Sequence, residues 1–307
     1  MRKLVAGFLV LAVFAALLIF RSNFFLQKVG NNRKSQSSKS KQIELVIAGD
    51  VMLGRTVMTR SLDMGDPVYP FRKIAPTLKA ADIAFVNLEN PVISNCPRFA
   101  DGFKFCTDPK MIDGLLYAGV DVVTIANNHI RNFGESGVGE TRDFLARSGI
   151  EATGLKNLVI KEVNGVKFGF IGFDFVTYKP TPEDYQLVAE SNSKVNILIV
   201  APHWGTEYTS SPNKFQKETG RKLVALGADL IVGSHPHWVQ GWEYVDGVPV
   251  FWSLGNLVFD QMWSQETRRG LVVRIKFDEK KILGIEELPI YMKNWAQPEL
   301  VGEDKLN

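Results

Sequence analysis

The stretch LIVGSHPHWVQ, residues 230–240, runs from three apolar residues into Gly233 and then into two histidines. The same change from an apolar run to asparagine, proline or tryptophan surrounds the other histidines, in TIANNHI (124–130) and LIVAPHWGTEY (198–208). These four are all the histidines of the chain. Because polar residues at the carboxyl ends of parallel strands face one crevice, the pattern predicts that the imidazoles meet there.

Two acidic residues repeat this design, since Asp50 follows the apolar start of IAGDVMLGR (47–55) and Glu89 follows IAFVNL (83–88). Carboxylate, amide and imidazole groups together suit manganese, iron or zinc. This set of candidate ligands contains no cysteine, which argues against a closed structural zinc site. The sequence predicts a metal-assisted hydrolytic site with one or two divalent ions. The expected ligands are Asp50, Glu89, Asn128, His203, His235 and His237.

Most of these residues also have a plain structural reading. Asp50 could cap a turn, Glu89 could be a solvated loop residue, Asn127 or Asn128 could satisfy a turn, and His129 could be a hydrogen-bonded loop histidine. His235-Pro236-His237 is more specific, because side chains at i and i+2 of an extended segment point the same way. Proline favours an extended residue before it, so we expect both imidazoles to reach one metal cluster.

From residue 43 onward, short apolar runs alternate with helix-like stretches. Strands are expected at 43–48, 82–86, 121–125, 195–201 and 229–232, with helices at 71–80, 109–118, 135–148 and 213–226. Asn164-Gly165 predicts a hairpin turn between VIKEV and VKFGFIGF. Later hairpin-like runs, at 242–254 and 271–288, indicate that the second sheet is mixed or antiparallel. The fold class is therefore α/β, with two sheets face to face and helices outside.

The N-terminus differs from the rest. Residues 4–20 are apolar or small and uncharged, with basic residues on both sides. We expect 1–21 to be an uncleaved signal-anchor, with a cleaved signal or a buried core helix as alternatives. Residues 22–42 are rich in serine, asparagine and lysine, which predicts a flexible basic linker before a domain at 43–307.

Charge separates the two regions as well. Residues 1–42 carry eight of the 36 basic residues and no acidic one, so the remainder has 28 basic against 33 acidic residues. That balance argues against nucleic acid as a partner. A strict positive-inside count would keep the domain in the cytoplasm, whereas a basic start before a long domain is the usual export arrangement. We expect a single-pass membrane protein with its soluble domain outside the cytoplasm.

The only cysteines, Cys96 and Cys106, are ten positions apart. In an exported protein this pair indicates a local disulfide, and two free thiols are the alternative.

Six blocks resemble the CapA-type proteins of bacterial capsule and poly-γ-glutamate synthesis, a branch of the calcineurin-like metallophosphoesterase superfamily. They occur in the family's order, within residues 45–261. The blocks are GDVMLGR (49–55), VNLENPV (86–92), ANNHIRNFG (126–134), HWGTEY (203–208), GSHPHWVQG (233–241) and SLGNLVFDQ (253–261). The resemblance implies a two-sheet metallophosphoesterase-like sandwich flanked by helices, with metal ligands at the sheet edges.

The resemblance also implies roles for single residues. Asp50 matches the first-block aspartate, Glu89 stands where a bridging aspartate is usual, and Asn128 matches the amide ligand. His203, His235 and His237 match the histidine ligands, and His129 matches the histidine that donates a proton to the leaving group or steadies the transition state. The guanidinium of Arg55 suits an anionic group. We expect the substrate to contact Arg55, Asn127, Trp204 and Glu207.

The chain departs from the phosphoesterase pattern at three points. Met52 stands where the first block has a histidine, and a thioether is a poor ligand for a hard cation. Glu89 is one methylene longer than aspartate, and Asn132 replaces an acidic residue common in CapA-type proteins. With these departures, the site is compatible with one bound ion, with two or with none.

Three functions follow as alternatives. The first is a metal-dependent hydrolase or transferase that acts on a phosphate ester or on an exported anionic polymer. The second is a non-catalytic, membrane-tethered component that binds poly-γ-glutamate or capsule material for a synthesis and export complex. The third is a saccharide-binding module that uses tryptophans, which could also simply pack in the core. The tryptophans in or beside the later blocks are Trp204, Trp238, Trp242, Trp252 and Trp263.

Overall fold

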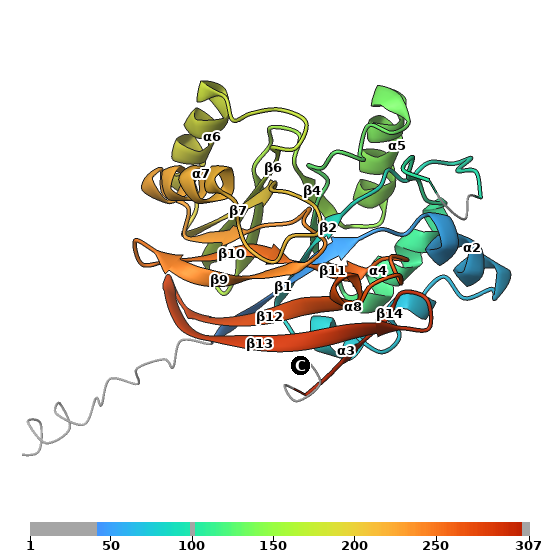
Figure 1. The fold of residues 1–307 in the computed structure, drawn as a ribbon. Helices are drawn as coiled ribbons and strands as arrows, with labels where there is room; N and C mark the ends of the chain where they lie inside the picture. Colours follow the sequence, from blue (N-terminus) through green and yellow to red (C-terminus); the bar gives the residue numbers. More distant parts are fainter. Residues whose placement is uncertain (1–41, 99–101, 303–307) are drawn as a thin grey trace, which may run out of the picture. The chain divides into compact units, whose positions relative to one another are not determined.

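The computed structural model describes residues 42–98 and 102–302, which form a pair of β-sheets between two groups of helices (Figure 1). The two-sheet α/β architecture expected from the sequence is confirmed. The expected signal-anchor at 1–21 and almost all of the linker at 22–42 lie outside the described residues. Within residues 42–98 and 102–302, every helix is too short or too polar to cross a bilayer.

The first sheet has eight strands, in the order β14-β13-β12-β1-β2-β3-β4, with β11 paired to β1 off this path. β1 to β4 run parallel, whereas β12, β13 and β14 are antiparallel to their neighbours. The strands are β1 (Ile43–Val51), β2 (Ile83–Leu88), β3 (Val122–Thr124), β4 (Glu151–Thr153), β11 (Asn256–Val258), β12 (Arg269–Asp278), β13 (Lys281–Lys293) and β14 (Gln297–Leu300).

The second sheet has six strands, in the order β5-β6-β7-β8-β10-β9. Its centre is parallel from β6 through β8 to β10, and the edge strands β5 and β9 are antiparallel. The strands are β5 (Val159–Val163), β6 (Val166–Asp174), β7 (Ile197–His203), β8 (Leu230–Val232), β9 (Val239–Val245) and β10 (Val248–Leu254). The expectation of a mixed second sheet is confirmed.

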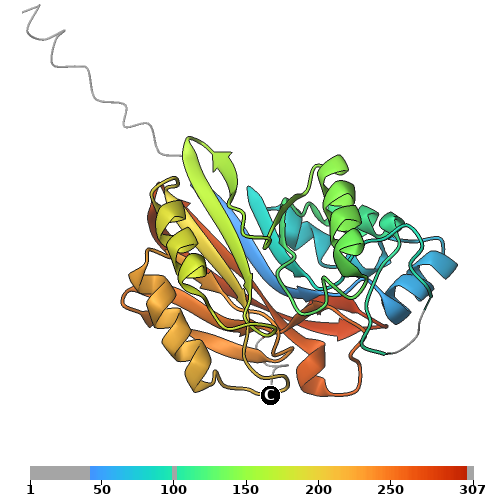
Figure 2. The same ribbon diagram turned by 90° about the horizontal axis from the view of Figure 1, so that it is seen from above.

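Helices cover the outer face of each sheet. In Figures 1 and 2, the blue-to-green helices α2 to α5 lie on one side of the sheets, and the yellow α6 and orange α7 lie on the other. The helical segments are α2 (Arg55–Asp63), η1 (Tyr69–Phe71), α3 (Ala75–Lys79), η2 (Pro109–Met111), α4 (Ile112–Ala118), α5 (Gly134–Arg147), α6 (Pro182–Asn192), α7 (Lys214–Ala225) and α8 (Gln265–Arg268).

Three apolar clusters hold these layers together. In the first sheet, alternate residues of β1 point to opposite faces, as strand geometry requires. Val46 packs toward α2 to α5, whereas Leu45 and Ile47 pack between the sheets against Phe168 and Phe170. The third cluster joins the outer face of the second sheet to α6 and α7. Both faces of the central strands are therefore buried, which explains their near-continuous apolar sequences.

Turn and cap residues account for several element ends. Asn164 and Gly165 have φ values of 52° and 81°, the left-handed pair that a tight hairpin turn requires, so this predicted turn is confirmed. Asn213 caps α7 by accepting a hydrogen bond from the backbone N–H of Gln216, whose side chain in turn accepts from the Asn213 N–H. Helices α2 and α6 were not among the elements expected from the sequence.

One part of the sequence-based topology needs correction. The hairpin of β12 and β13 follows the second sheet in the chain, yet β12 pairs with β1 and extends the first sheet. Hydrophobic alternation marks a strand but carries no information on its distant partner. As a result, both sheets are mixed.

The expected Cys96–Cys106 disulfide is present, with 5.7 Å between the Cα atoms. Closing a loop of this length restricts the unfolded chain, so replacing both cysteines by serine is expected to lower the free energy of unfolding by about 2–3 kcal/mol. Urea unfolding of the oxidised parent and the double variant measures this difference. Equal unfolding midpoints would show that the bond does not stabilise the fold.

Candidate metal centre

The candidate ligands come from the carboxyl ends of parallel strands in both sheets. Asp50 lies near the end of β1, and Glu89 directly follows β2. His203 is the last residue of β7, and His235 follows β8. The backbone N–H of Glu89 donates to Val51 O at 2.8 Å, so the two carboxylates are held beside each other.

Asp50, Glu89 and His203 form the centre of the group. Their ligand atoms all lie within 4.8 Å of one another, and all three side chains are fully buried. His237 joins them, with its Nδ1 3.2 Å from Asp50 Oδ2 and its Nε2 3.6 Å from Glu89 Oε1. The ring of His235 lies 4.9 Å from that of His203, measured between centroids.

Asn128 and His129 close one side of this group. Asn128 Oδ1 lies 3.0 Å from His203 Nε2, and its Nδ2 lies 3.2 Å from His129 Nε2. His129 Nε2 is 4.0 Å from Glu89 Oε1. The structure therefore brings together all six predicted ligands and the predicted catalytic histidine.

Burial makes this group electrostatically unusual. It raises the pKa of Glu89 well above the ordinary range, and the Asp50 carboxylate adds to that shift. Glu89 Oε1 is buried without a hydrogen-bond partner among the described residues. Two neighbouring carboxylates and an unpartnered oxygen are costly in the interior unless a cation balances them.

Three imidazoles have the opposite pKa shift. Burial lowers the pKa of His203 well below the usual value, and it lowers those of His129 to about 4 and His235 to about 3. Neighbouring histidines contribute to each shift. These three rings are therefore neutral near pH 7, which is the form that binds metal.

Two asparagines fix the orientation of the rings. The Asn256 amide nitrogen donates to Gln261 Oε1 and Thr267 O, so its oxygen faces His237 Nδ1 at 3.0 Å. Asn132 Oδ1 accepts from the Phe105 N–H at 2.6 Å and lies 3.1 Å from His129 Nδ1. Both contacts place the ring proton on Nδ1 and leave Nε2 directed at Glu89, as outer hydrogen bonds commonly do for metal-binding histidines.

The backbone of the His235-Pro236-His237 segment differs from the expectation. His235 and His237 have φ values of 96° and 60°, so the segment is not extended. Both rings still enter the centre, with centroids 6.0 Å apart. The left-handed turns, rather than the alternation of a strand, bring them there.

The expected substrate contacts are placed in different surroundings. The Arg55 guanidinium pairs with Asp260 and lies 4.7 Å from the centre of the Phe105 ring, which stacks on His129. The Phe105 ring therefore lies between Arg55 and His129, and Asp260 balances the charge of Arg55. The buried Asn127 amide donates to Leu88 O and Asn87 Oδ1 and accepts from the His129 N–H, so it holds the loop.

Trp204 does not line a groove, which corrects the expectation from the sequence. Its side chain is fully buried, stacks on Trp252 and donates to Trp252 O at 3.0 Å. Among the five tryptophans named above, only Trp263 is largely exposed, at 62%. Glu207 is half-buried, contributes to the raised pKa of Glu89, and accepts a hydrogen bond from the Tyr208 hydroxyl.

Sequence reasoning missed three residues that contact the centre. Asn87 donates to Asp50 Oδ1 at 2.8 Å and to Glu89 Oε2 at 3.3 Å, Ser234 Oγ lies 2.8 Å from His203 Nδ1, and Asn256 orients His237. Each lies within two residues of a ligand or inside a quoted block. Polar residues that interrupt apolar strands were the available signal.

The sequence matches the family model described as bacterial capsule synthesis protein PGA_cap over residues 44–261. The match covers the strands that carry every candidate ligand. The chain belongs to the PGA_cap family.

Two relatives support this membership of the PGA_cap family. The PGA biosynthesis protein CapA of Bacillus subtilis (strain 168) is 30% identical, over 84% of this chain and 73% of that protein. The capsule biosynthesis protein CapA of Bacillus anthracis is 29% identical, over 86% of this chain and 71% of that protein. The chain is therefore a CapA-like member of a capsule and poly-γ-glutamate biosynthesis family.

A solved structure shares the fold. A hypothetical protein from Thermus thermophilus superposes with a TM-score of 0.55 at 13% sequence identity, over 82% of this chain and all of that chain. At this identity the similarity concerns the fold alone. For the PGA_cap chain described here, the donor set itself fits a divalent cation: two carboxylates, neutral imidazoles and an unpartnered Glu89 oxygen converge in a buried place.

Proposed function

We propose that this chain is a membrane-tethered component of capsule or poly-γ-glutamate synthesis and export, with a divalent-metal hydrolase-type centre. The relatives named for PGA and capsule biosynthesis support the pathway. The apolar run at 4–20 supports the tether, with the folded domain outside the cytoplasm. Manganese, iron or zinc, as one ion or two, suits the donors.

The observation that carries this proposal is the buried convergence of Asp50, Glu89 and His203 within 4.8 Å. A protein gains no stability from gathering two carboxylates in its core, because burial raises the cost of each charge. A bound cation turns the same arrangement into a stable one. The fold positions these donors through strand ends, which hold side chains more firmly than mobile loops do.

The side chains around the centre would have two roles, metal binding and proton transfer. Asp50, Glu89, Asn128, His203, His235 and His237 would hold the metal, which when bound polarises a substrate oxygen and lowers the pKa of a water molecule. His129 presents Nε2 to the same space while Asn132 holds its Nδ1, so it is placed to move a proton at Nε2. Burial excludes bulk water from these groups.

One observation favours a second candidate function, a non-catalytic component that binds the polymer through a degenerate centre. Met52 is fully buried, and its sulfur accepts the Gly54 N–H at 3.0 Å. The side chain at this position therefore serves the β1–α2 loop and adds no imidazole to the centre. A centre with fewer ligands can retain an ion and bind an anion without turning it over.

A paired experiment separates the two functions. The full chain is purified without a metal-affinity tag, its metal content is measured by mass spectrometry, and it is assayed with a generic phosphodiester and with γ-glutamyl oligomers. We expect stoichiometric metal in the parent and, in His235→Ala, at least a tenfold loss of bound metal and turnover, since even outer partners of ligands matter by about 10–100-fold. Lys214→Ala, an exposed change on α7, is the matched control.

The outcomes are distinct. Metal together with turnover that His235→Ala abolishes supports the enzyme. Oligomer binding without turnover supports the polymer-binding component. A parent protein that binds none of the three cations would refute the metal centre.

A further inference from the structure

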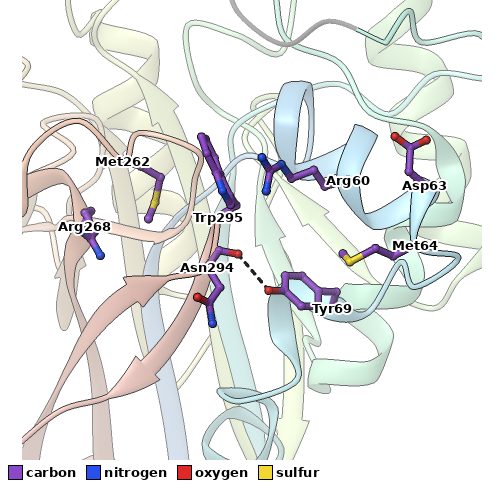
Figure 3. Close-up of a pocket in the computed structure, with 8 residues that line it drawn as sticks. All are labelled: Arg60, Asp63, Met64, Tyr69, Met262, Arg268, Asn294 and Trp295. Carbon is purple, nitrogen blue, oxygen red and sulfur yellow. Dashed lines mark hydrogen bonds between the residues drawn. The ribbon is translucent and has the colours of Figure 1, made fainter.

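A second cavity lies outside the candidate metal centre, between α2, the α8 region and the turn that joins β13 to β14 (Figure 3). Its volume is about 680 Å³. We call it the arginine pocket, because Arg60 and Arg268 both line it, together with Tyr69, Asn294 and Trp295.

The two arginines give the arginine pocket a positive charge that no neighbouring carboxylate among the described residues balances. Among residues 42–98 and 102–302, neither Arg60 nor Arg268 has a carboxylate within ion-pair distance. The one acidic residue of the lining, Asp63, pairs with Arg98, and in Figure 3 it lies on the far side of Arg60 from Trp295. Two unpaired guanidinium groups in one concave place favour an anionic ligand.

An aromatic ring lies close to each of the two guanidinium groups. Arg60 lies 4.1 Å from the Trp295 ring centre, and Arg268 lies 4.4 Å from that of Tyr291. Arg268 Nε donates to Met292 O at 3.1 Å, and its terminal nitrogens have no hydrogen-bond partner among residues 42–98 and 102–302. A guanidinium that stacks on a ring keeps its edge N–H groups for a planar acceptor, and a carboxylate accepts two of them side by side.

Trp295 lies in a tight turn with an unusual backbone conformation. Asn294, Trp295 and Ala296 have φ values of 48°, 61° and 69°, three consecutive left-handed residues without a glycine. The turn is held by Tyr69, whose hydroxyl donates to Asn294 O and whose carbonyl accepts from Gln297 Nε2. These two contacts hold the β13–β14 turn in place, and Trp295 is 43% exposed there.

The arginine pocket shares one lining residue, Trp295, with a cavity nearer the metal centre. Trp295 also lines a neighbouring cavity of about 440 Å³, together with Arg55, Tyr208 and Trp263. The Tyr208 ring lies 5.9 Å from that of His237, between centroids. Trp295 thus separates the arginine pocket from the cavity that Tyr208 and Trp263 line.

We infer that the arginine pocket binds carboxylates of an extended polyanion, a polymer with one free carboxylate on each repeat unit, several units away from the metal centre. This inference rests on the proposed function, because it assumes that the protein binds an anionic polymer and says where carboxylates of that polymer would bind. The aromatic wall suits the methylene groups of each repeat, and the arginines suit its charges.

The test measures binding of a fluorescent γ-glutamyl oligomer to the full-length protein by anisotropy at fixed salt. Arg60→Gln and Arg268→Gln are each expected to weaken binding about tenfold, and the double variant more, because a charge-assisted hydrogen bond is lost in each. Arg142→Gln, an exposed arginine on α5, is the matched control and should bind as the parent does. A neutral γ-glutaminyl oligomer should not bind, and free glutamate should compete poorly.

Equal binding by the parent and the double variant, or competition by free glutamate as strong per carboxylate as that of the oligomer, would overturn the inference. The metal content of each variant is measured in parallel. Retained metal with unchanged oligomer affinity refutes only the arginine pocket. Absent metal with lost affinity in the double variant refutes only the metal centre and supports the pocket.

Discussion

Glu89→Gln is expected to make the metal-free fold more stable than the parent near pH 7 and to lower metal affinity about 100-fold or more. The side chain is fully buried, and only one of its oxygens has a hydrogen-bond donor, Asn87 Nδ2. Glutamine has the same shape and keeps that acceptor, and its new N–H₂ group would face His237 Nε2, now 3.6 Å from Glu89 Oε1. The substitution thus removes the carboxyl group that a cation would need, without leaving a cavity.

Two melting curves for each protein measure this effect, one with a chelator and one with saturating manganese, iron or zinc. Without metal near pH 7, we expect Glu89→Gln to have a higher unfolding free energy than the parent, because burial raises the pKa of the Glu89 carboxyl and glutamine does not have that cost. With metal, the parent should gain stability in proportion to its affinity, and Glu89→Gln should gain little.

Glu207→Gln is the matched control for this pair of curves. Glu207 is half-buried beside the centre but outside the cluster of Asp50, Glu89 and His203. Its substitution should preserve most of the gain from metal. A Glu89→Gln protein that gains as much as the parent would show that Glu89 does not bind the ion.

The sequence predicted the gathering of the candidate ligands because its two signals are local. Apolar runs mark buried strands, and a polar residue at the carboxyl end of a parallel strand has few places to go other than the crevice. Asp50, Glu89 and His203 all follow that rule. Their closeness needs only that the strands be parallel, which the alternation with helices indicated.

The supporting residues were not predictable in this way, because they depend on pairing between distant strands. Asp50 stands opposite Asn87 on β2 and opposite Asn256 on β11. Both partners are distant from Asp50 in sequence, and no local pattern specifies either register. Asn256 thus reaches His237 through the register between β1 and β11.

Trp204 is a second case in which the local sequence did not predict the surroundings of a side chain. A tryptophan after a strand-end histidine resembles a ligand-binding aromatic residue. In the fold, its ring turns away from the crevice into the layer of α7, where Gly220 and Gly233 leave the room that it occupies. Space made by residues distant in sequence is visible only in the packed structure.

Gly49→Ala is expected to cost about 3 kcal/mol or more of unfolding free energy. A Cβ atom at Gly49 would overlap the Gly255 carbonyl oxygen and lie 2.9 Å from its carbon. That oxygen accepts the Asp50 N–H at 2.9 Å, so the backbone there cannot retreat without breaking the pairing of β1 and β11. The displacement would also move Asp50 relative to Asn256 and His237.

The same substitution at Gly139 should have the opposite sign, which makes it a sharp control. Gly139 lies within α5, and a methyl group added there would have no atom within 4 Å, so alanine should stabilise the chain by about 0.5–1 kcal/mol through helix propensity. Urea unfolding of the three proteins gives both differences. If Gly49→Ala unfolds at the same urea concentration as the parent, β11 is not held against β1 by close backbone contact, and the link from Asp50 through Asn256 to His237 loses its structural basis.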